Sequence, residues 1–234
     1  MDITTLSLDV RTKLESSYFE LLDAGFQPND LDIKIIQAYA TVPANSAPVL
    51  ELNNKNANVS GSTLLPGQEL IQDNDAFIGV AGVVGLTSAA AVADLAFARI
   101  YPYADFLIWA TGNVNNAAQS IFSSGKVQLQ IGTRTAMQPR LMRFFERPYN
   151  PQAGAGTVAT PPAGPNANYT LLDKNYGLSG ANRNFLQFDL GKSVLTNLPA
   201  TTYLAVNLIG WGIVDGAKRT DELAMTQNLC VVRA

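Results

Sequence analysis

Basic and aromatic side chains concentrate in one short part of this 234-residue chain. The basic members are four arginines: Arg134, Arg140, Arg143 and Arg147. Phe144, Phe145 and Tyr149 are interleaved with them. Guanidinium groups bind phosphates and aromatic rings stack on bases, so this composition can serve a nucleic acid or an anionic lipid. Arginines also pair with carboxylates, either within a fold or between subunits.

The element expected around these arginines favours the second use. Residues 140–145 read as a strand, and side chains alternate between the two faces of a strand. Arg143, Phe145 and Arg147 then share one face, while Arg140 and Phe144 share the other with their acidic neighbour Glu146. Because no purely basic stripe results, we predict inter-subunit or intrachain pairing of the arginines ahead of contact with nucleic acid or lipid.

The composition excludes several classes of chemistry. The chain has no histidine, which removes the Ser-His-Asp and Cys-His arrangements and imidazole zinc sites. Cys230 is the single cysteine, so an intrachain disulfide and a multi-thiolate cluster are both excluded. A net charge of −3 argues against a protein that coats nucleic acid unaided. We predict that the chain is not an enzyme and has no catalytic residues, no metal ligands and no cofactor.

Residues 76–93 carry no charge and reach the minimum length for a membrane span. Glycine and alanine supply much of the segment, however, and its valines suit a strand. We therefore expect a buried strand at 77–84. The glycines Gly79, Gly82 and Gly85 do not match a nucleotide-binding pattern, and the acidic triplet 73–75 is better explained as a turn than as a cation site.

One helix is expected, at residues 9–24. Apolar residues recur there at spacings of three and four: Val10, Leu14, Tyr18, Leu21 and Leu22. Asp9 is expected to cap the start, and Gly25 followed by Pro28 to end the helix. This apolar face is expected to pack on the chain's own sheet or on a neighbouring subunit, with a membrane surface as the alternative.

The rest of the chain favours strands separated by turns, without alternating βαβ units. The strand candidates are residues 31–35, 49–52, 64–71, 76–84, 104–110, 126–131, 140–145, 184–190, 203–213 and 228–232. Many short strands with frequent turns indicate an all-β sandwich or barrel. In the strand at 126–131, Val127, Leu129 and Ile131 are expected to face inward together.

The expected organisation is an N-terminal helical segment, residues 1–26, followed by a β body, residues 27–234. Residues 150–168 are rich in proline, glycine and alanine and are predicted to form a flexible surface loop within that body. The start of the chain lacks the basic and apolar regions of a secretory signal, so export by that route is not expected.

Three stretches of the sequence resemble the major capsid proteins of tailless icosahedral bacteriophages, especially small membrane-containing ones. They are LLPGQEL at 64–70 continuing through DNDAFIGV at 73–80, IFSSGKVQLQI at 121–131, and MRFF at 142–145 with Pro148 and Gln152. The resemblance implies jelly-roll barrels, often two in each chain, and an N-terminal segment that faces an inner membrane or the genome. The strand count fits a single jelly roll with insertions about as well as a compact double one.

The resemblance also implies a function: a structural virion protein, the major capsid subunit of an icosahedral shell around the genome. Its expected partners are copies of itself in a trimer or higher capsomer, other virion proteins, and an internal lipid membrane where the virion has one. Genome contact would be indirect or through the N-terminal segment. The expected location is the virion, assembled in the host cytoplasm.

Two alternative functions remain open at this stage. A carbohydrate-binding β-sandwich would use exposed aromatic residues such as Trp109, Trp211 or Tyr101 as a sugar platform. A membrane-active protein would use residues 76–93 as a span.

Overall fold

The computed structural model describes six stretches of the chain: residues 6–41, 48–54, 69–88, 124–145, 169–190 and 202–217. In these stretches one helix, α1 (Leu8–Asp23), precedes the strands. The strands are β1 (Leu31–Thr41), β2 (Val49–Glu51), β3 (Ala76–Ser88), β4 (Lys126–Ile131), β5 (Arg134–Leu141), β6 (Thr170–Ser179), β7 (Asn184–Asp189) and β8 (Thr202–Ile213). Two short 3-10 helices, Pro28–Asp30 and Met142–Phe145, lie before β1 and after β5. The predicted all-β class with one N-terminal helix is confirmed.

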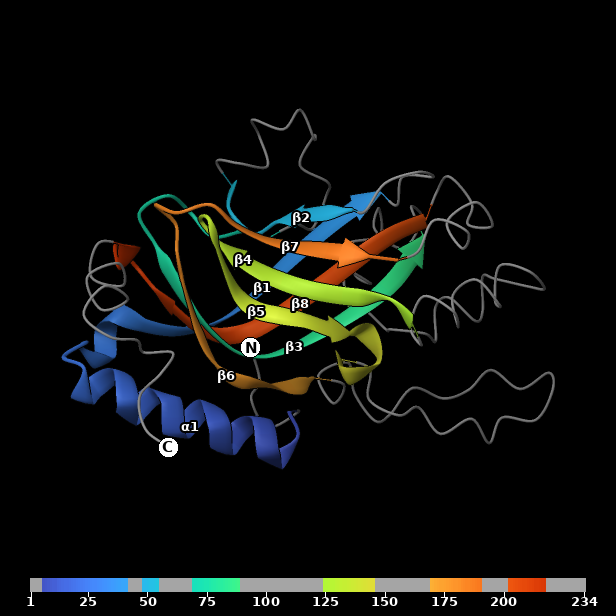
Figure 1. Cartoon of the computed structure of the whole chain (residues 1–234). Coiled ribbons are helices and arrows are strands. Elements are labelled where there is room, and N and C mark those ends of the chain that lie inside the picture. Colours follow the sequence, from blue (N-terminus) through green and yellow to red (C-terminus); the bar gives the residue numbers. More distant parts are fainter. Residues whose placement is uncertain are drawn as a thin grey trace.

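The strands form two antiparallel sheets that face one another (Figure 1). The first sheet has the order β1-β8-β3-β6, and the second has the order β2-β7-β4-β5. Among the eight described strands, only β4 and β5 are both consecutive and in the same sheet. They are joined by a turn in which Gly132 has φ 58°. A glycine suits that position because it has no Cβ to clash at positive φ.

The strands of both sheets pair in one regular order. β1 pairs with β8, β2 with β7, β3 with β6, and β4 with β5. Two further pairings, β3 with β8 and β4 with β7, join these ribbons side by side into the two sheets. The first half of the strand sequence therefore runs antiparallel to the second half throughout.

The core lies between the inner faces of the two sheets. Its largest fully buried side chains include Phe77 and Tyr176 from the first sheet and Phe188 from the second. Val127 and Leu129 are buried as expected, and Ile131 packs partly buried against the same cluster. Alternation along β4 puts Val127 and Leu129 inward and the amides Gln128 and Gln130 outward, as one buried face of a sheet requires. On β7, Leu186 and Phe188 face inward in the same way, together with the buried amide of Asn184.

Helix α1 covers the outer face of the first sheet (Figure 1). Val10 and Leu14 pack there with Val80 and Ile209. Of the five residues predicted to face inward, Val10, Leu14 and Leu21 are buried, whereas Tyr18 and Leu22 are half-buried. The apolar face of the helix therefore packs on the chain's own sheet, as expected.

The ends of α1 differ in how well they were predicted. Gly25 has φ 91°, its N–H donates to Leu22 O, and the N–H of Phe26 donates to Leu21 O. This is the hydrogen-bond pattern of a glycine-terminated helix. The predicted cap at Asp9 is wrong, because Ser7 occupies the N-cap position and Asp9 lies within the first turn.

The strand predicted at 140–145 is wrong, and two edge strands were wholly or mostly missed. Residues 140–145 do not form one strand: β5 ends at Leu141, and Met142–Phe145 is a 3-10 helix. Most of β5 and all of β6 were not predicted, because both are edge strands with mixed polar sequences and show no clean alternation. Pro139 is tolerated in β5 because an edge strand needs fewer N–H donors.

The other predicted strands, apart from the one at 64–71, are either confirmed or lie outside the residues that the structure describes. Strands at 31–35, 49–52, 76–84, 126–131, 184–190 and 203–213 are confirmed within one or two residues at most ends. β1 extends further, to Thr41, and β3 extends further, to Ser88. Of the strand predicted at 64–71, the described residues 69–71 form isolated bridges and not a strand. Residues 64–68, 104–110, 150–168 and 228–232 lie outside the described residues. Among the described residues, no helix is both long and apolar enough to cross a bilayer.

Candidate functional site

The predicted arginine cluster is only partly within the described residues. Arg134 begins β5 and is exposed to solvent. Arg140, on the same strand, donates from Nη2 to Asp173 Oδ2 at 2.5 Å. Arg147 and the side chain of Arg143 lie outside the description. Arg140 therefore has an acidic partner inside the chain.

Arg140 and Asp173 join the two sheets at one side of the sandwich. Arg140 lies on β5, the edge of the second sheet, and Asp173 lies on β6, the edge of the first. The hydroxyl of Tyr176 donates to the other oxygen of Asp173 at 2.8 Å. The ring of Tyr176 is buried in the core. We call Arg140, Asp173 and Tyr176 the edge clasp, and its anchoring in the core distinguishes it from an isolated surface ion pair.

Backbone hydrogen bonds join the sheets at the opposite side. Gln37 on β1 and Glu69 exchange two N–H···O bonds of 2.8 and 3.0 Å. Two residues later, the N–H of Ile71 donates to Leu52 O at 2.9 Å, just beyond β2. The segment 69–71 therefore links the outer strand of one sheet to the outer strand of the other. Both sides of the sandwich are tied together.

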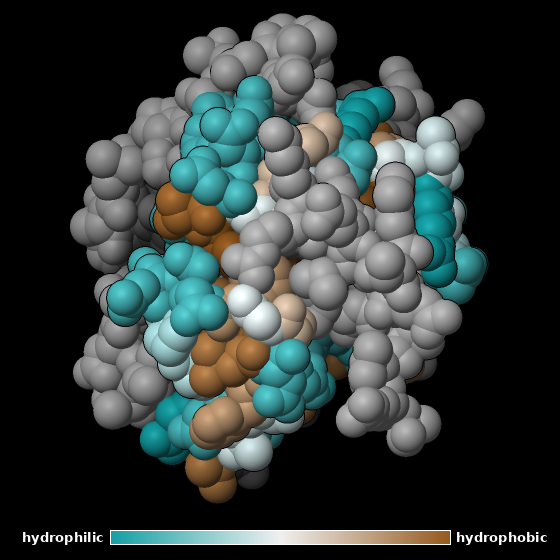
Figure 2. Space-filling view, turned by 90° about the vertical axis from the view of Figure 1, so that its left-hand side faces the viewer, coloured by the Kyte–Doolittle hydropathy of each residue, from teal (hydrophilic) through white to brown (hydrophobic). Residues whose placement is uncertain are grey.

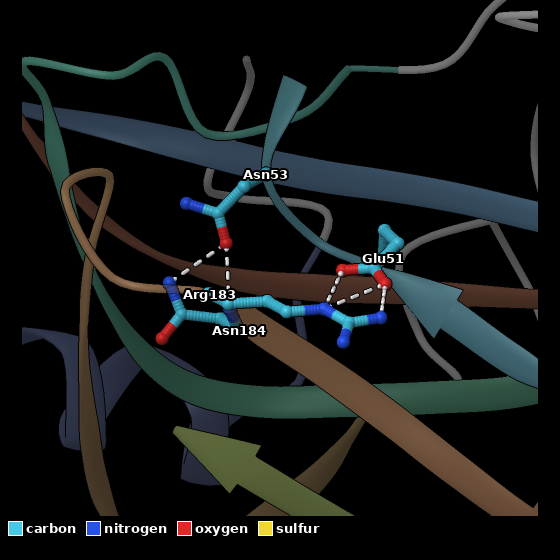
Figure 3. A network of polar contacts seen from close by, with 4 residues as sticks. All are labelled: Glu51, Asn53, Arg183 and Asn184. Atoms are coloured by element: carbon cyan, nitrogen blue, oxygen red, sulfur yellow. Dashed lines mark hydrogen bonds and ion pairs between the residues drawn. The ribbon is translucent and has the colours of Figure 1, made fainter. Parts of the chain in front are cut away.

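Buried amides occupy one end of the sandwich, where β6 turns into β7 (Figure 3). Asn53 and Asn184 are fully buried. Asn53 Oδ1 accepts from the backbone N–H and from Nδ2 of Asn184, both at 2.8 Å. Asn184 Nδ2 also donates to Ser179 O at 2.7 Å, and Asn53 Nδ2 donates to Gly180 O at 3.2 Å. These bonds hold the β6–β7 turn against the residues that follow β2.

An ion pair lies beside these two amides. The guanidinium of Arg183 donates to the carboxylate of Glu51, and Figure 3 shows the two groups meeting beside Asn53 and Asn184. Hydrogen bonding to Glu51 raises the pKa of Arg183 above its ordinary value. The guanidinium also lies 4.6 Å from the ring centre of Phe185. The charge is thus held by a carboxylate and by an aromatic ring of its own chain.

Acidic residues at the same end take structural roles. Asp75 N–H donates to Gln72 O at 3.1 Å, which closes the turn expected at residues 73–75. The Asp75 carboxylate accepts from the backbone N–H of Asp215 at 3.2 Å and lies 3.8 Å from Lys34 Nζ. Within the described stretches, no three His, Cys, Asp or Glu side chains come together as a metal site. Figure 2 shows the side of the molecule that lies on the left in Figure 1, where hydrophobic residues form separate patches among hydrophilic ones.

A groove of about 300 Å³ runs between α1 and the first sheet. On the helix side it is lined by Arg11, Glu15, Tyr18 and Phe19. On the sheet side it is lined by Ile33 and Trp211. We call this surface the helix groove. Its lining combines aromatic side chains with one positive and one negative charge.

Trp211 anchors the helix at this groove. Its indole N–H donates to Leu14 O at 3.1 Å and to Ser17 Oγ at 3.0 Å, and its ring centre lies 5.2 Å from that of Tyr18. Trp211 is therefore half-buried beneath α1 and is not the exposed sugar platform considered from the sequence. Trp109 and Tyr101, the other two aromatic candidates, lie outside the described residues.

Comparisons of the chain with protein-family models, with curated proteins and with solved structures find no match.

Proposed function

We propose that the chain is a structural virion protein, the major capsid subunit of an icosahedral shell around a genome. The observation that carries the proposal is the strand order, β1-β8-β3-β6 facing β2-β7-β4-β5. β1 to β4 pair in turn with β8 to β5, so the chain follows one long antiparallel ribbon rolled into two layers. This order supports a jelly roll, and the eight described strands support a single one.

Jelly rolls occur in viral capsids, in lectins and in cupins, so the fold must be combined with other observations. The absence of histidine leaves a cupin without imidazole ligands. Of the aromatic residues considered for a lectin's sugar platform, Trp211 is engaged with α1, and Trp109 and Tyr101 lie outside the described residues. The sequence resemblance to capsid proteins of tailless phages, together with only 15% charged residues, favours the capsid. Buried interface cores are depleted in charge, as a subunit with many neighbours requires.

The proposal includes the partners that the resemblance implies. Copies of the chain would form a trimer or higher capsomer and would meet other virion proteins. Helix α1 would face the interior, towards the genome or an internal lipid layer. Since Val10, Leu14 and Leu21 are buried against the sheet, any such contact would use the outward side of α1. The virion, assembled in the host cytoplasm, is the proposed location.

Of residues 76–93, the described part, 76–88, enters the proposal as sheet and not as a membrane span. Residues 76–88 form β3, which lies between β8 and β6 in the first sheet. A membrane-active protein would have to remove this strand from the centre of its own fold.

Light scattering coupled to size-exclusion chromatography tests the proposal on the purified full chain. The expected result is a mass that is a multiple of three subunits, or particles of much larger mass. A monomer that persists at high concentration and binds a glycan array would contradict the capsid proposal and support the carbohydrate-binding one.

A further inference from the structure

Helix α1 has a second stripe beside its buried face, exposed at Leu8 and Glu15 and half-buried at Arg11 and Tyr18. Leu8 is 71% exposed and Phe19 is 63% exposed. Positions 8, 11, 15 and 18 follow the alternating three- and four-residue spacing of a helix that packs against another helix. Leu8, Arg11, Glu15 and Tyr18 occupy these positions, and the last three line the helix groove. Exposed apolar residues beside a groove are typical of a contact surface.

The two charges of this stripe have no ion-pair partner within the described part of the chain. Arg11 Nε is buried and makes no hydrogen bond there. Glu15 is exposed at the same groove. Since they are four residues apart on one face, the stripe carries a positive and a negative charge one helical turn from each other. An identical stripe running antiparallel places opposite charges against both.

We propose that α1 pairs with α1 of a second copy of this chain, antiparallel and about a two-fold axis. When Arg11 lies opposite Glu15 of the second copy, two-fold symmetry also puts Glu15 opposite its Arg11. The same register brings Leu8 opposite Tyr18 of the second copy, at the mouth of the groove. Both charges and both apolar positions are then matched by one arrangement.

A second copy fits this surface better than a lipid bilayer does. Residues 8–23 carry Arg11 and Lys13 against four acidic residues: Asp9, Glu15, Glu20 and Asp23. A helix with this excess of negative charge gains no electrostatic attraction from anionic headgroups. Self-pairing needs no external charge, because the stripe is complementary to itself.

The contact is small, and its size sets the expected strength. A helix of 16 residues is about 24 Å long, so two such helices bury less than the roughly 1,200 Å² of a standard interface. The pairing is therefore weak between two isolated copies and is reinforced where many copies assemble. It deepens the proposed function and rests on it, since it names one contact between subunits.

Cysteine cross-linking tests the register directly. In a Cys230→Ser background, one preparation carries Arg11→Cys and another carries Glu15→Cys. Under mild oxidation, the mixture is expected to give a disulfide-linked dimer at least about tenfold faster than either preparation alone, because position 11 faces position 15. Lys13→Cys mixed with Arg11→Cys is the matched control, since Lys13 lies on the opposite side of the helix. Equal rates in all mixtures overturn the pairing.

Charge exchange tests the electrostatic match without introducing a thiol. Arg11→Glu or Glu15→Arg alone places like charges opposite one another twice in each pair and is expected to weaken self-association in sedimentation equilibrium by about tenfold or more. The double variant Arg11→Glu with Glu15→Arg is expected to restore it. Single variants that associate like the unmodified chain, or a double variant that stays weak, overturn the pairing.

The two proposals can fail separately. Particles that form while the mixture gives no cross-link leave the capsid proposal standing and overturn the helix pairing. A cross-linked dimer from a chain that never assembles beyond two copies supports the pairing and overturns the capsid proposal.

Discussion

Arg140 on β5 and Asp173 on β6 form an ion pair that joins the outer strands of the two sheets. Tyr176 extends this contact into the core, because its buried ring carries the hydroxyl that donates to the second carboxylate oxygen of Asp173. The clasp thereby ties the sandwich at the side where β5, paired with β4, and β6, paired with β3, are the outer strands of their sheets.

Asp173→Asn is expected to destabilise the fold by about 1–2 kcal/mol, because it weakens both the ion pair and the hydrogen bond from Tyr176. Urea unfolding followed by circular dichroism measures the change. Arg134→Ala, on the same strand as Arg140, is the control and is expected to change stability by less than about 0.5 kcal/mol. Coupling between Arg140 and Asp173 near zero in a double-mutant cycle would contradict the clasp.

Gly180→Ala is expected to be severely destabilising. A Cβ at this position would lie 1.8 Å from Gln72 O and 2.8 Å from Asp75 O, so the backbone around the β6–β7 turn must move. We expect a loss of at least about 3 kcal/mol or insoluble expression. Gly132→Asn is the matched control, because nothing lies within 4 Å of that site and asparagine tolerates its positive φ. Similar stability of the two variants would show that the turn is wrongly placed.

Asn53→Ala is expected to lower the unfolding free energy by about 1–3 kcal/mol. The substitution leaves the buried backbone N–H of Asn184 without its acceptor, while Asn184 Nδ2 keeps its hydrogen bonds to Ser179 O and Asn182 O. Thermal unfolding of the variant measures the loss. Asn54→Ala, which removes a side-chain hydrogen bond to Gln72 in a less buried setting, should be close to neutral. A mild effect at Asn53 would mean that the amide network is not formed.

Alkaline pH is expected to destabilise the fold through its buried tyrosines. Burial raises the pKa of Tyr39 from 10.0 to about 12, and burial also raises the pKa of Tyr169. Below about pH 10 the hydroxyls are protonated in both states, so they add no pH dependence. Between pH 10 and 12 the unfolded chain loses protons that the folded chain retains, so stability falls by about 1 kcal/mol per pH unit for each tyrosine.

Tyr39→Phe isolates the contribution of one of these tyrosines. Its unfolding free energy should fall less steeply than that of the unmodified chain between pH 10 and 12, as measured by urea unfolding at several pH values. Identical slopes for the two proteins would show that Tyr39 is not buried in its neutral form.

The sequence predicted those helices and strands in which apolar residues recur at a regular spacing along one buried face. Helix α1 and strand β4 have that property, since Val10 and Leu14 or Val127 and Leu129 repeat at the spacing of their element. β6 was missed because Asp173 and Asn175 interrupt its apolar pattern, and both have partners that are distant in the chain. Periodicity carries no information on such partners.

The same limit applies to the candidate sites. The sequence singled out Arg140 but could not supply Asp173, which is 33 residues away and comes close only when the two edge strands meet. Asn53 and Asn184 gave no signal, since their 131-residue separation is closed by the fold alone. Ser17 was missed on α1 because a polar residue does not mark a buried face, although it is buried and accepts the hydrogen bond of Trp211.

Electron microscopy of the purified full chain under assembly conditions tests the central claim, that copies of this sandwich build a closed shell. The account predicts icosahedral particles whose repeating unit contains the two four-stranded sheets with α1 on the outer face of the first. Separate subunits at every concentration and ionic strength, with no closed particles, would contradict it.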